Sequence, residues 1–443
     1  RAIEAGVRRF APGVLRTVAL FAPEPAPAGL MGQFGVEGGG PGYTLLKEGL
    51  REGLSLRETD LASGQVPEDA DLLMVVAPED LDEKQQFAID QFLMQGGTVI
   101  VTASRFHVDL GGAAISARPQ TTGLEDWLEQ LGVTLEPSLV LDPQNTPFPI
   151  PVQRSLGGFM VEEIQTLDYP YFPDVRADGL GEASGITADL GQVTMNWSSP
   201  ITVDTEANAD REVTGLIESS AGSWTSDSPA VQPDFAAYPD LGFARGDDRG
   251  RKLLAVAIEG RFESAFRGQP SPLLPGAAAG SEADADDAAD PAAAGGEVGS
   301  ASEGPTRAEG DAPASDADAT VVSAVVERSP SSARLILIGS STFLSDTAIS
   351  LATEATRTRY LKPLELIQNA VEWSLEDRGL LALRGRGQFG RLLEPVGRQQ
   401  RMLIEYLNYA LALGGLVLVY WLHRMLQRRR ERAYAEILAG GNA

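Results

Sequence analysis

The sequence predicts an α/β fold with a mostly parallel sheet covered by helices on both faces. A β-rich α+β module and one C-terminal transmembrane helix are expected to follow. Three observations support this. Apolar runs alternate with segments of helical spacing over the first 150 residues. From about Pro151 the segments become strand-like and are separated by turn-forming residues. Near the end, residues 406–422 form a run of 17 residues without a charge.

Strands and helices are expected to alternate in the first region. In order, these are a strand within 15–23, a helix within 42–53, a strand within 71–78, a helix within 82–97, a strand within 98–104, a helix within 122–132 and a strand within 137–142. The run DLLMVVAP is apolar throughout, which is typical of a parallel strand buried on both faces. Asp80 and Glu83 have capping-box spacing ahead of the second helix, and Gly96–Gly97 ends it.

The later part of the chain is strand-rich. Strand-like segments occupy 192–204, 211–220 and 251–266, and a buried strand within 333–346 precedes an amphipathic helix within 363–377. Between them, residues 275–320 hold eleven acids and one base and supply −10 of the net charge of −26. Ala, Gly, Ser, Asp, Glu and Pro bury too little apolar surface to offset ordering, so we expect a disordered acidic insertion within a β-containing domain. An acidic interaction segment is the alternative.

These patterns divide the chain into six regions. They are an extracytoplasmic α/β domain at 1–150, a β-rich module at 151–274, the acidic insertion at 275–320, a continuation of either module with a juxtamembrane segment at 321–398, a transmembrane helix at 399–427 and a basic cytoplasmic tail at 428–443.

Composition excludes several function classes. A net charge of −26 repels phosphate backbones, so nucleic acid is not an expected partner. The absence of cysteine excludes thiolate metal sites and cysteine nucleophiles. His107 and His423 are the only histidines, so no multi-histidine site or cofactor is expected. No lysine follows a glycine, which excludes a Walker A phosphate loop.

The apolar run at 406–422 predicts a membrane span, with a long buried helix of a soluble domain as the alternative. Aromatic residues lie at both ends, as in a membrane-interface belt: Tyr406, Tyr409, Tyr420 and Trp421. Five arginines follow the run, at 424, 428, 429, 430 and 432, whereas three precede it closely. This bias favours a cytoplasmic C-terminus in the inner or plasma membrane, with the bulk of the chain outside the cytoplasm.

Several stretches, taken in order, resemble the GldG family. They are VVAPEDLDEKQQFAIDQFLMQGGTVIV, LLAVAIEGRFESAF, RLILIGSSTFLSD and LIQNAVEWSLEDRGLLALRGRG, followed by one span and a basic tail. Members of that family are auxiliary components of type-2 ABC exporters, named from bacterial gliding motility. The resemblance implies an extracytoplasmic domain beside a transporter, with permease and ATPase subunits as partners. In related proteins this part is often fused behind permease helices, so further chain ahead of Arg1 is expected.

The resemblance also implies a flavodoxin-like or amidotransferase-like α/β domain. Amidotransferases place a cysteine on the turn after a sheet strand, whereas this chain offers Ser104 and His107 after the strand at 98–104. Residues so close on a turn seldom meet as nucleophile and base, and no G-x-S-x-G motif occurs, so a structural role is expected. If a ligand or partner does bind, the carboxyl ends of the parallel strands are the expected place. The candidate residues there are Glu79, Asp80, Ser104, Arg105 and His107.

A second motif lies just before the span. GRGQFG at 385–390 matches G-x-G-x-x-G, but no strand follows it, so a dinucleotide site is not expected. Instead, Arg384, Arg386 and Arg391 are predicted to contact lipid headgroups or a partner subunit. The acidic pairs at 79–80 and 82–83 are expected to cap a helix, with general acid–base catalysis as the alternative.

Three functional hypotheses remain. The first is a non-enzymatic, membrane-anchored accessory subunit of an ABC exporter whose outer domain binds substrate or organises the complex. The second is a membrane-anchored hydrolase or amidotransferase-like enzyme. The third is a stand-alone module that binds glycans or peptides. The absence of cysteine and of clustered histidine favours the first and third.

Overall fold

The structure is a computed structural model. It describes residues 16–24, 42–109, 115–156, 159–181, 184–188, 190–274, 325–375, 406–425 and 427, with the backbone alone for 151–164. The described residues up to Leu375 belong to one compact unit, and the C-terminal helix belongs to a second.

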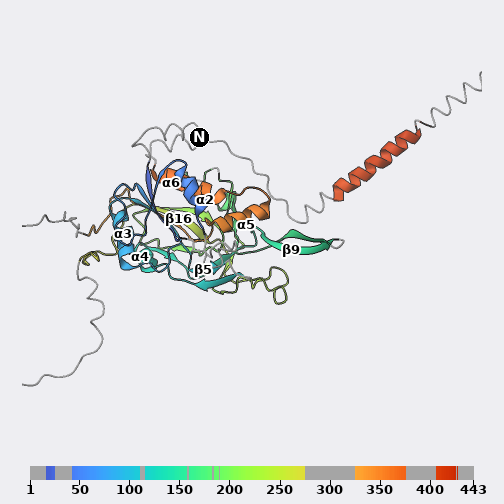
Figure 1. The fold of residues 1–443 in the computed structure, drawn as a ribbon. Helices are drawn as coiled ribbons and strands as arrows, with labels where there is room; N and C mark the ends of the chain where they lie inside the picture. The colour runs from blue at the N-terminus through green and yellow to red at the C-terminus, as the bar shows by residue number, and fades with distance from the viewer. Residues whose placement is uncertain are drawn as a thin grey trace, which may run out of the picture. The chain divides into compact units, whose positions relative to one another are not determined.

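A nine-stranded sheet forms the centre of the first unit (Figure 1). Eight strands follow the order β2-β1-β3-β4-β17-β16-β13-β7, and β14 also pairs with β16. The strands are β1 (Thr17–Phe21), β2 (Ser55–Glu58), β3 (Leu72–Val76), β4 (Thr98–Thr102), β7 (Val133–Leu135), β13 (Ile201–Val203), β14 (Glu212–Glu218), β16 (Leu253–Glu259) and β17 (Arg334–Ile338).

Five neighbouring strands, from β2 to β17, are parallel, and the others join antiparallel. In the register, Thr98 of β4 faces both Leu72 of β3 and Arg334 of β17. The late strands β16 and β17 therefore lie in the same sheet as the strands of the first 150 residues. This sheet confirms the predicted α/β class with a largely parallel centre.

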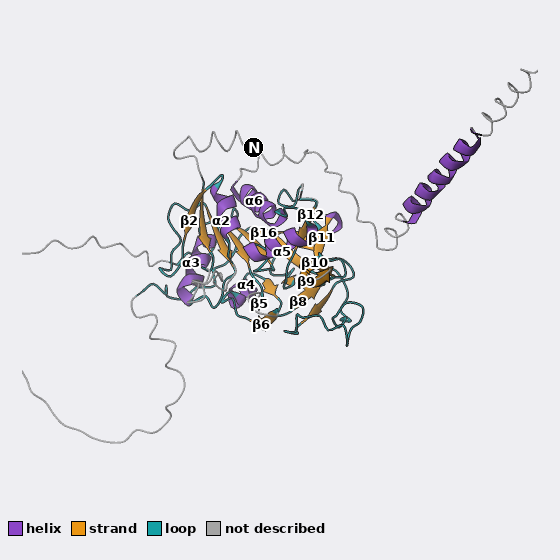
Figure 2. Ribbon diagram, turned by 45° about the vertical axis from the view of Figure 1, so that its right-hand side comes forward, coloured by secondary structure: helices purple, strands orange, loops and turns teal. Residues whose placement is uncertain are grey.

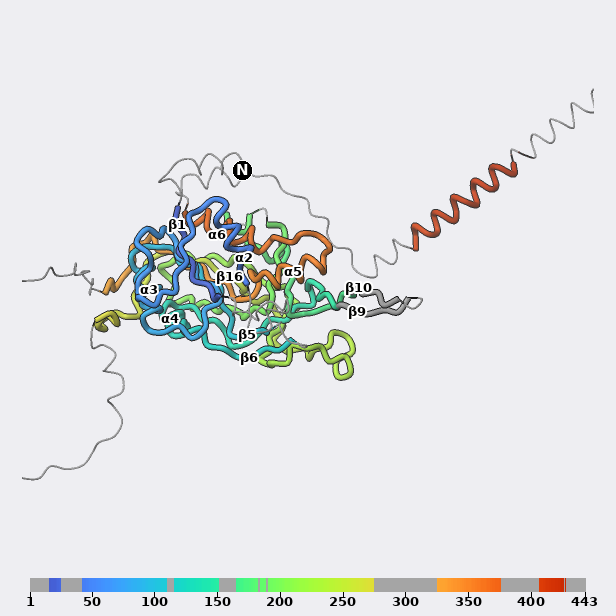
Figure 3. The backbone as a smooth tube through the Cα atoms, viewed as in Figure 1, coloured from blue at the N-terminus to red at the C-terminus, as the bar shows by residue number. Residues whose placement is uncertain are grey.

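Helices cover both faces of the sheet (Figure 2). Alternate strand residues such as Met74 and Ile100 pack against α2 (Thr44–Arg51), α5 (Asp346–Thr356) and α6 (Lys362–Leu375). Their neighbours Leu73 and Val99 pack against α3 (Glu83–Met94) and α4 (Glu125–Gln130). Figure 3 follows the chain from the early helix α2 to α5 and α6, which lie beside it. The two-faced burial explains why the strands are apolar throughout.

The start of α3 differs from the prediction. The capping box consists of Asp82 and Gln85, rather than Asp80 and Glu83: the Asp82 carboxylate accepts the Gln85 N–H, and the Gln85 side chain accepts the Asp82 N–H. Asp80 has a left-handed φ of 48° and lies before the N-cap. Gly96 has φ 93° and ends the helix as expected.

Among the described residues, four two-stranded sheets stand outside the central sheet. They are β5 (Phe106–Asp109) with β6 (Ser116–Pro119), β8 (Leu139–Leu141) with β15 (Trp224–Ser226), β9 (Phe148–Leu156) with β10 (Phe159–Leu167), and β11 (Asp174–Arg176) with β12 (Gln192–Thr194). A short 3₁₀ helix, η2 (Ala177–Gly179), follows β11. The strand expected within 137–142 is therefore real but antiparallel and outside the parallel sheet, because β8 pairs with β15. An aromatic core that includes Tyr169, Phe172 and Trp197 holds this region together.

The predicted acidic insertion lies outside the described residues, but the segments on either side of it are described. We call residues 262–264 and 327–329 its two roots. Phe262 donates its N–H to the Ser329 hydroxyl at 2.8 Å, and Ser329 donates its N–H back to the Phe262 carbonyl at 2.9 Å. Ser264 donates its N–H to the Glu327 carbonyl, also at 2.9 Å. The chain segments that enter and leave the insertion are therefore bonded to each other.

The second unit contains a helix at Tyr406–Met425, of 20 residues, whose most apolar 18-residue window has a mean hydropathy of 1.2. By length and composition it is able to cross a membrane. It agrees with the predicted span in position, while membrane insertion and orientation stay predictions.

Candidate functional site at the carboxyl edge of the sheet

The carboxyl ends of β3, β4 and β17 lie level with one another. In the register, Thr102 faces both Val76 and Ile338. The loops that follow continue the ladder, because Ala77 donates its N–H to Thr102 and Ala103 donates to Ile338. The predicted site residues follow β3 and β4, so the topology brings them to one edge.

Glu79 and His107 meet on the surface of this edge. The Glu79 carboxylate accepts a hydrogen bond from Arg118 at 2.8 Å, and Nδ1 of His107 lies 4.0 Å from its other oxygen. His107 and Arg118 face each other across β5 and β6, which explains why both reach Glu79. We call these three residues the edge cluster. Sequence reasoning missed Arg118, because the β5–β6 pairing leaves no signal in spacing.

Asp80 joins two loops instead of facing the edge cluster. Its carboxylate accepts a hydrogen bond from the Thr121 hydroxyl, and its N–H donates to the Thr121 carbonyl at 3.1 Å. Asp80 therefore holds the loop after β3 against the loop before α4.

Ser104 is buried, with 1% of its surface exposed. Its hydroxyl lies 3.3 Å from both the Trp197 carbonyl and the Ser199 hydroxyl, and it accepts the Phe106 N–H at 3.2 Å. Among the described contacts of Ser104, none reaches His107, whose ring lies in the exposed edge cluster. A serine–histidine pair is thus not formed in this geometry.

Arg105 connects β4 to the start of α4. Its guanidinium forms an ion pair with Glu125 at 3.0 Å, and its backbone N–H donates to the Ser199 hydroxyl at 3.0 Å. Glu125 also accepts the N–H groups of Thr122 and Gly123, at 2.7 and 3.0 Å. Arg105 therefore has a structural role, because its side chain is bound to Glu125 and its backbone to Ser199.

The loop at 196–199 covers the ends of β4 and β17. Ser199 donates its N–H to the Gly339 carbonyl at 2.6 Å, and the Asn196 carbonyl accepts the Ser340 hydroxyl at 2.6 Å. Trp197 is buried in the aromatic core with a left-handed φ of 44°. Protein atoms therefore occupy this part of the edge, and the exposed part lies beside β3. No spacing or composition signal predicted this covering loop.

The buried Tyr43 contacts the loop that follows β17, at the part of the edge that the loop at 196–199 covers. The Tyr43 hydroxyl donates to the Ser341 carbonyl at 3.0 Å. Burial, reinforced by the nearby charge of Asp346, raises the pKa of the Tyr43 hydroxyl well above its usual range. Tyr43 therefore stays a neutral donor and a packing group.

Two hollows, of about 270 and 520 Å³, lie elsewhere, and no predicted site residue lines either one. Within the described residues, no cluster of three or more His, Cys, Asp or Glu side chains fits a metal ion. Arg384, Arg386 and Arg391 lie outside the described residues, so their predicted contacts stay predictions.

Comparison with known proteins places the chain in a family. A family model described as "ABC-type uncharacterized transport system" matches residues 17–370. A protein of Borreliella burgdorferi, itself described as uncharacterized, is 21% identical over 225 residues, which are 49% of this chain. The chain spans only 42% of the length of that relative.

Two solved structures are distantly similar. The "mmIFT52 N-terminal domain" is 9% identical, with a TM-score of 0.37, over 82% of this chain and 98% of that chain. A putative ThuA-like protein from Bacteroides uniformis is 12% identical, with a TM-score of 0.28, over 55% of this chain and 76% of that chain. Neither likeness is close enough to define the fold. The family match is what identifies the chain: it belongs to the family described as ABC-type uncharacterized transport system.

Proposed function

We propose that this chain is a non-enzymatic, membrane-anchored accessory subunit of an ABC-type exporter, related to the GldG family. The observation that carries the proposal is the family match over residues 17–370. The outer domain binds substrate or organises the complex, and a permease and an ATPase are its partners.

The geometry of the edge supports a role in association. Ser104, the candidate nucleophile, is enclosed by Trp197 and Ser199, which leaves no room for a substrate carbonyl. By contrast, the edge cluster is accessible to solvent, with His107 half-buried and Glu79 and Arg118 exposed, and it presents a carboxylate, an imidazole and a guanidinium together. Such a mixed, polar surface suits the rim of a protein interface.

Anchoring by the helix at Tyr406–Met425 is part of the proposal. The helix has the length of a span, and the arginines that follow it favour a cytoplasmic C-terminus. A reporter fused after Ala443 should therefore be active on the cytoplasmic side. Protease added to intact spheroplasts should cleave within 275–320, and complete protection of that segment would contradict the orientation.

Purification of the intact chain from its native membrane tests the function itself. A permease and an ATPase should be recovered with it in a fixed ratio. Recovery of the chain alone, with hydrolytic activity abolished by Ser104→Ala or His107→Ala, would overturn the proposal in favour of an enzyme.

A pair of charge reversals tests whether the edge cluster makes the contact. Arg118→Glu should reduce recovery of the permease severalfold, because it places a second carboxylate beside Glu79. Arg57→Glu is the matched control: Arg57 is similarly exposed, with 61% against 58% of its side chain accessible, but lies on the outer strand β2. Equal recovery with both variants would exclude the edge cluster while leaving the accessory role untouched.

A further inference from the structure

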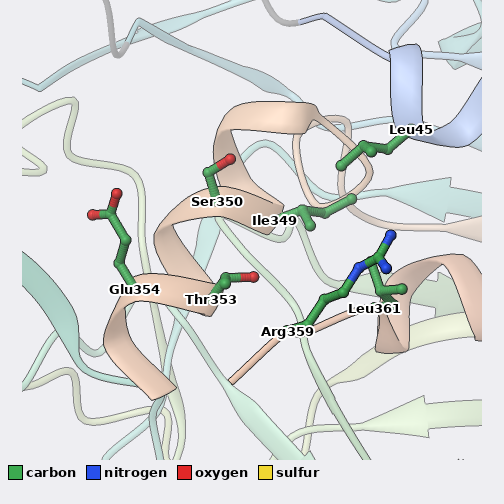
Figure 4. A pocket seen from close by; sticks show the side chains of 7 residues that line it. All are labelled: Leu45, Ile349, Ser350, Thr353, Glu354, Arg359 and Leu361. Atoms are coloured by element: carbon green, nitrogen blue, oxygen red, sulfur yellow. The ribbon is translucent and has the colours of Figure 1, made fainter. Parts of the chain in front are cut away.

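A hollow of about 270 Å³ lies on the face of the sheet that α2, α5 and α6 cover. It is bounded by α2, α5 and the connection from α5 to α6 (Figure 4). Its lining consists of Leu45, Ile349, Ser350, Thr353, Glu354, Arg359 and Leu361. Since one water molecule occupies about 30 Å³ of liquid, the hollow has room for a small organic group.

One side of the hollow is apolar. Ile349 is 3% exposed and belongs to the core, and Leu45 and Leu361 pack against that core as half-buried side chains. An apolar group placed here would leave water and contact three aliphatic side chains.

The other side offers hydrogen-bond donors. The Thr353 hydroxyl accepts the Tyr360 N–H at 3.2 Å, which leaves its own proton free for a ligand. Ser350 stands one turn earlier on the same helix face. Within the described residues, neither the Ser350 hydroxyl nor the Arg359 guanidinium has a hydrogen-bond or ion-pair partner. Figure 4 shows Glu354, the one carboxylate of the lining, extending away from Arg359.

The connection that carries Arg359 is held in place. Helix α5 ends at Thr356, and its C-cap residue Arg357 has a left-handed φ of 55° that turns the chain. Three residues after Arg357, Tyr360 is buried, and its hydroxyl accepts the Thr194 N–H at 2.7 Å. Arg359 therefore extends from a fixed backbone, which lowers the entropy cost of binding.

We propose that this hollow binds a carboxylate attached to a short apolar group. A guanidinium forms two parallel hydrogen bonds with a carboxylate, and the hydroxyls of Ser350 and Thr353 supply further donors. The apolar side distinguishes this ligand from inorganic phosphate, which has no group to place there. The carboxylate belongs either to a free small acid or to the C-terminal residue of a polypeptide. This inference is independent of the proposed transport function.

Calorimetry on the full chain in detergent tests the inference, with N-acetyl-leucine as the probe. N-acetyl-leucine should bind saturably, and its amide should bind at least about tenfold more weakly, because a charge-assisted hydrogen bond is lost. Arg359→Gln should weaken binding of the carboxylate to the same extent. Arg357→Gln is the matched control, because Arg357 is an exposed arginine of the same turn that does not line the hollow.

A second variant separates binding from folding. Ser350→Ala removes a donor whose hydroxyl makes no hydrogen bond within the described residues, so it should weaken binding severalfold while the circular dichroism spectrum stays unchanged. Tighter binding of a peptide that ends in leucine than of N-acetyl-leucine would identify a polypeptide as the source, and equal binding would identify a free acid. Equal affinity for acid and amide, unchanged binding in Arg359→Gln, or no binding of either carboxylate would overturn the inference.

Discussion

At the scale of single residues, close backbone contact shapes the covered edge. A Cβ atom added to Gly339 would lie 2.1 Å from the Ser199 carbonyl oxygen, so only glycine fits beneath the loop at 196–199. The left-handed backbone of Trp197 in that loop is a strained conformation for a bulky residue. The surrounding hydrogen bonds and aromatic packing offset this strain.

Gly339→Ala should therefore destabilise the chain by at least about 2 kcal/mol, because the added methyl group meets backbone rather than a flexible side chain. Gly53→Ala is the control, since no heavy atom lies within 4 Å of the Cβ position there. Urea unfolding followed by tryptophan fluorescence measures both. Equal midpoints for the two variants would contradict the tight contact.

The pKa of Asp248 predicts a pH dependence. Partial desolvation acts to raise this pKa, but hydrogen bonds from Thr225 and Lys252 outweigh it and lower the pKa to about 2. An unfolded aspartate has a pKa of about 3.9, so the ionised group stabilises the fold above about pH 4. That contribution is lost as the pH falls through 2. Since 43% of the side chain is exposed, its size is about 0.5 kcal/mol after solvent screening.

Asp248→Asn should accordingly lower the melting temperature slightly at pH 6, and the gap to the parent protein should close towards pH 2. Asp247→Asn, at the exposed neighbouring residue, serves as the control. A gap that stays constant from pH 6 to pH 2.5 would show that the ionised carboxylate is not the cause.

At the scale of elements, Arg334 fixes the end of α6 to the sheet. Its guanidinium pairs with Glu259 at 3.1 Å, donates to the carbonyls of Trp373 and Ser374, and lies 4.6 Å from the ring centroid of Trp373. These contacts satisfy terminal carbonyls of the helix that no residue within it can reach.

Arg334→Met should cost about 3–5 kcal/mol, because it removes the 3.1 Å ion pair with the buried Glu259 carboxylate. Hydrogen exchange should accelerate first in the last turn of α6. Arg328→Met is the control, since Arg328 pairs with Glu263 at an exposed position where solvent screens the charges, and its loss should cost far less. Similar losses in both variants would contradict the distinction between buried and exposed pairs.

Hydrophobic periodicity and the position of glycines predict these helices and strands well, but they do not predict which elements pack against each other. The strands β1, β3 and β4 and the helices α2 and α3 stand where apolar runs and glycines indicate them. Within α3, however, Asp90 is a charged residue that would be expected to face solvent, but it is fully buried. It accepts hydrogen bonds from Trp127, Ser264, Gln91 and the Ala265 N–H. Apart from the neighbouring Gln91, these donors lie at least 37 residues away in the sequence, so local pattern does not predict the contacts.

The candidate edge shows the same limit. The position of Glu79 and His107 follows from parallel topology, and the structure brings them within 4.0 Å. Burial of Ser104 depends on a loop almost a hundred residues later in the sequence, with partners at Trp197 and Ser199. Long-range covering of this kind follows from tertiary packing and not from residue spacing.

At the scale of the whole molecule, the insertion is expected to be dispensable for folding. Its roots are already bonded at Phe262–Ser264 and Glu327–Ser329, so the closure of the intervening segment costs only entropy that changes slowly with length. Deletion of residues 278–318 should leave expression and the melting temperature nearly unchanged. Phe262→Ala, which removes a fully buried ring next to the same root, is the destabilising comparison, at about 3–5 kcal/mol. A comparable loss in the deletion variant would show that the segment packs against the fold.

The order of strands in the central sheet has a consequence for biogenesis. During synthesis or translocation β4 emerges early, but its partner β17 follows only after the β-rich region and the insertion. Until then the edge of β4 is an open, apolar template for pairing with other chains. Sheets closed by such distant pairs fold slowly, since loop entropy must be overcome first. The nascent chain should therefore depend on a holding chaperone until residue 338 has been released.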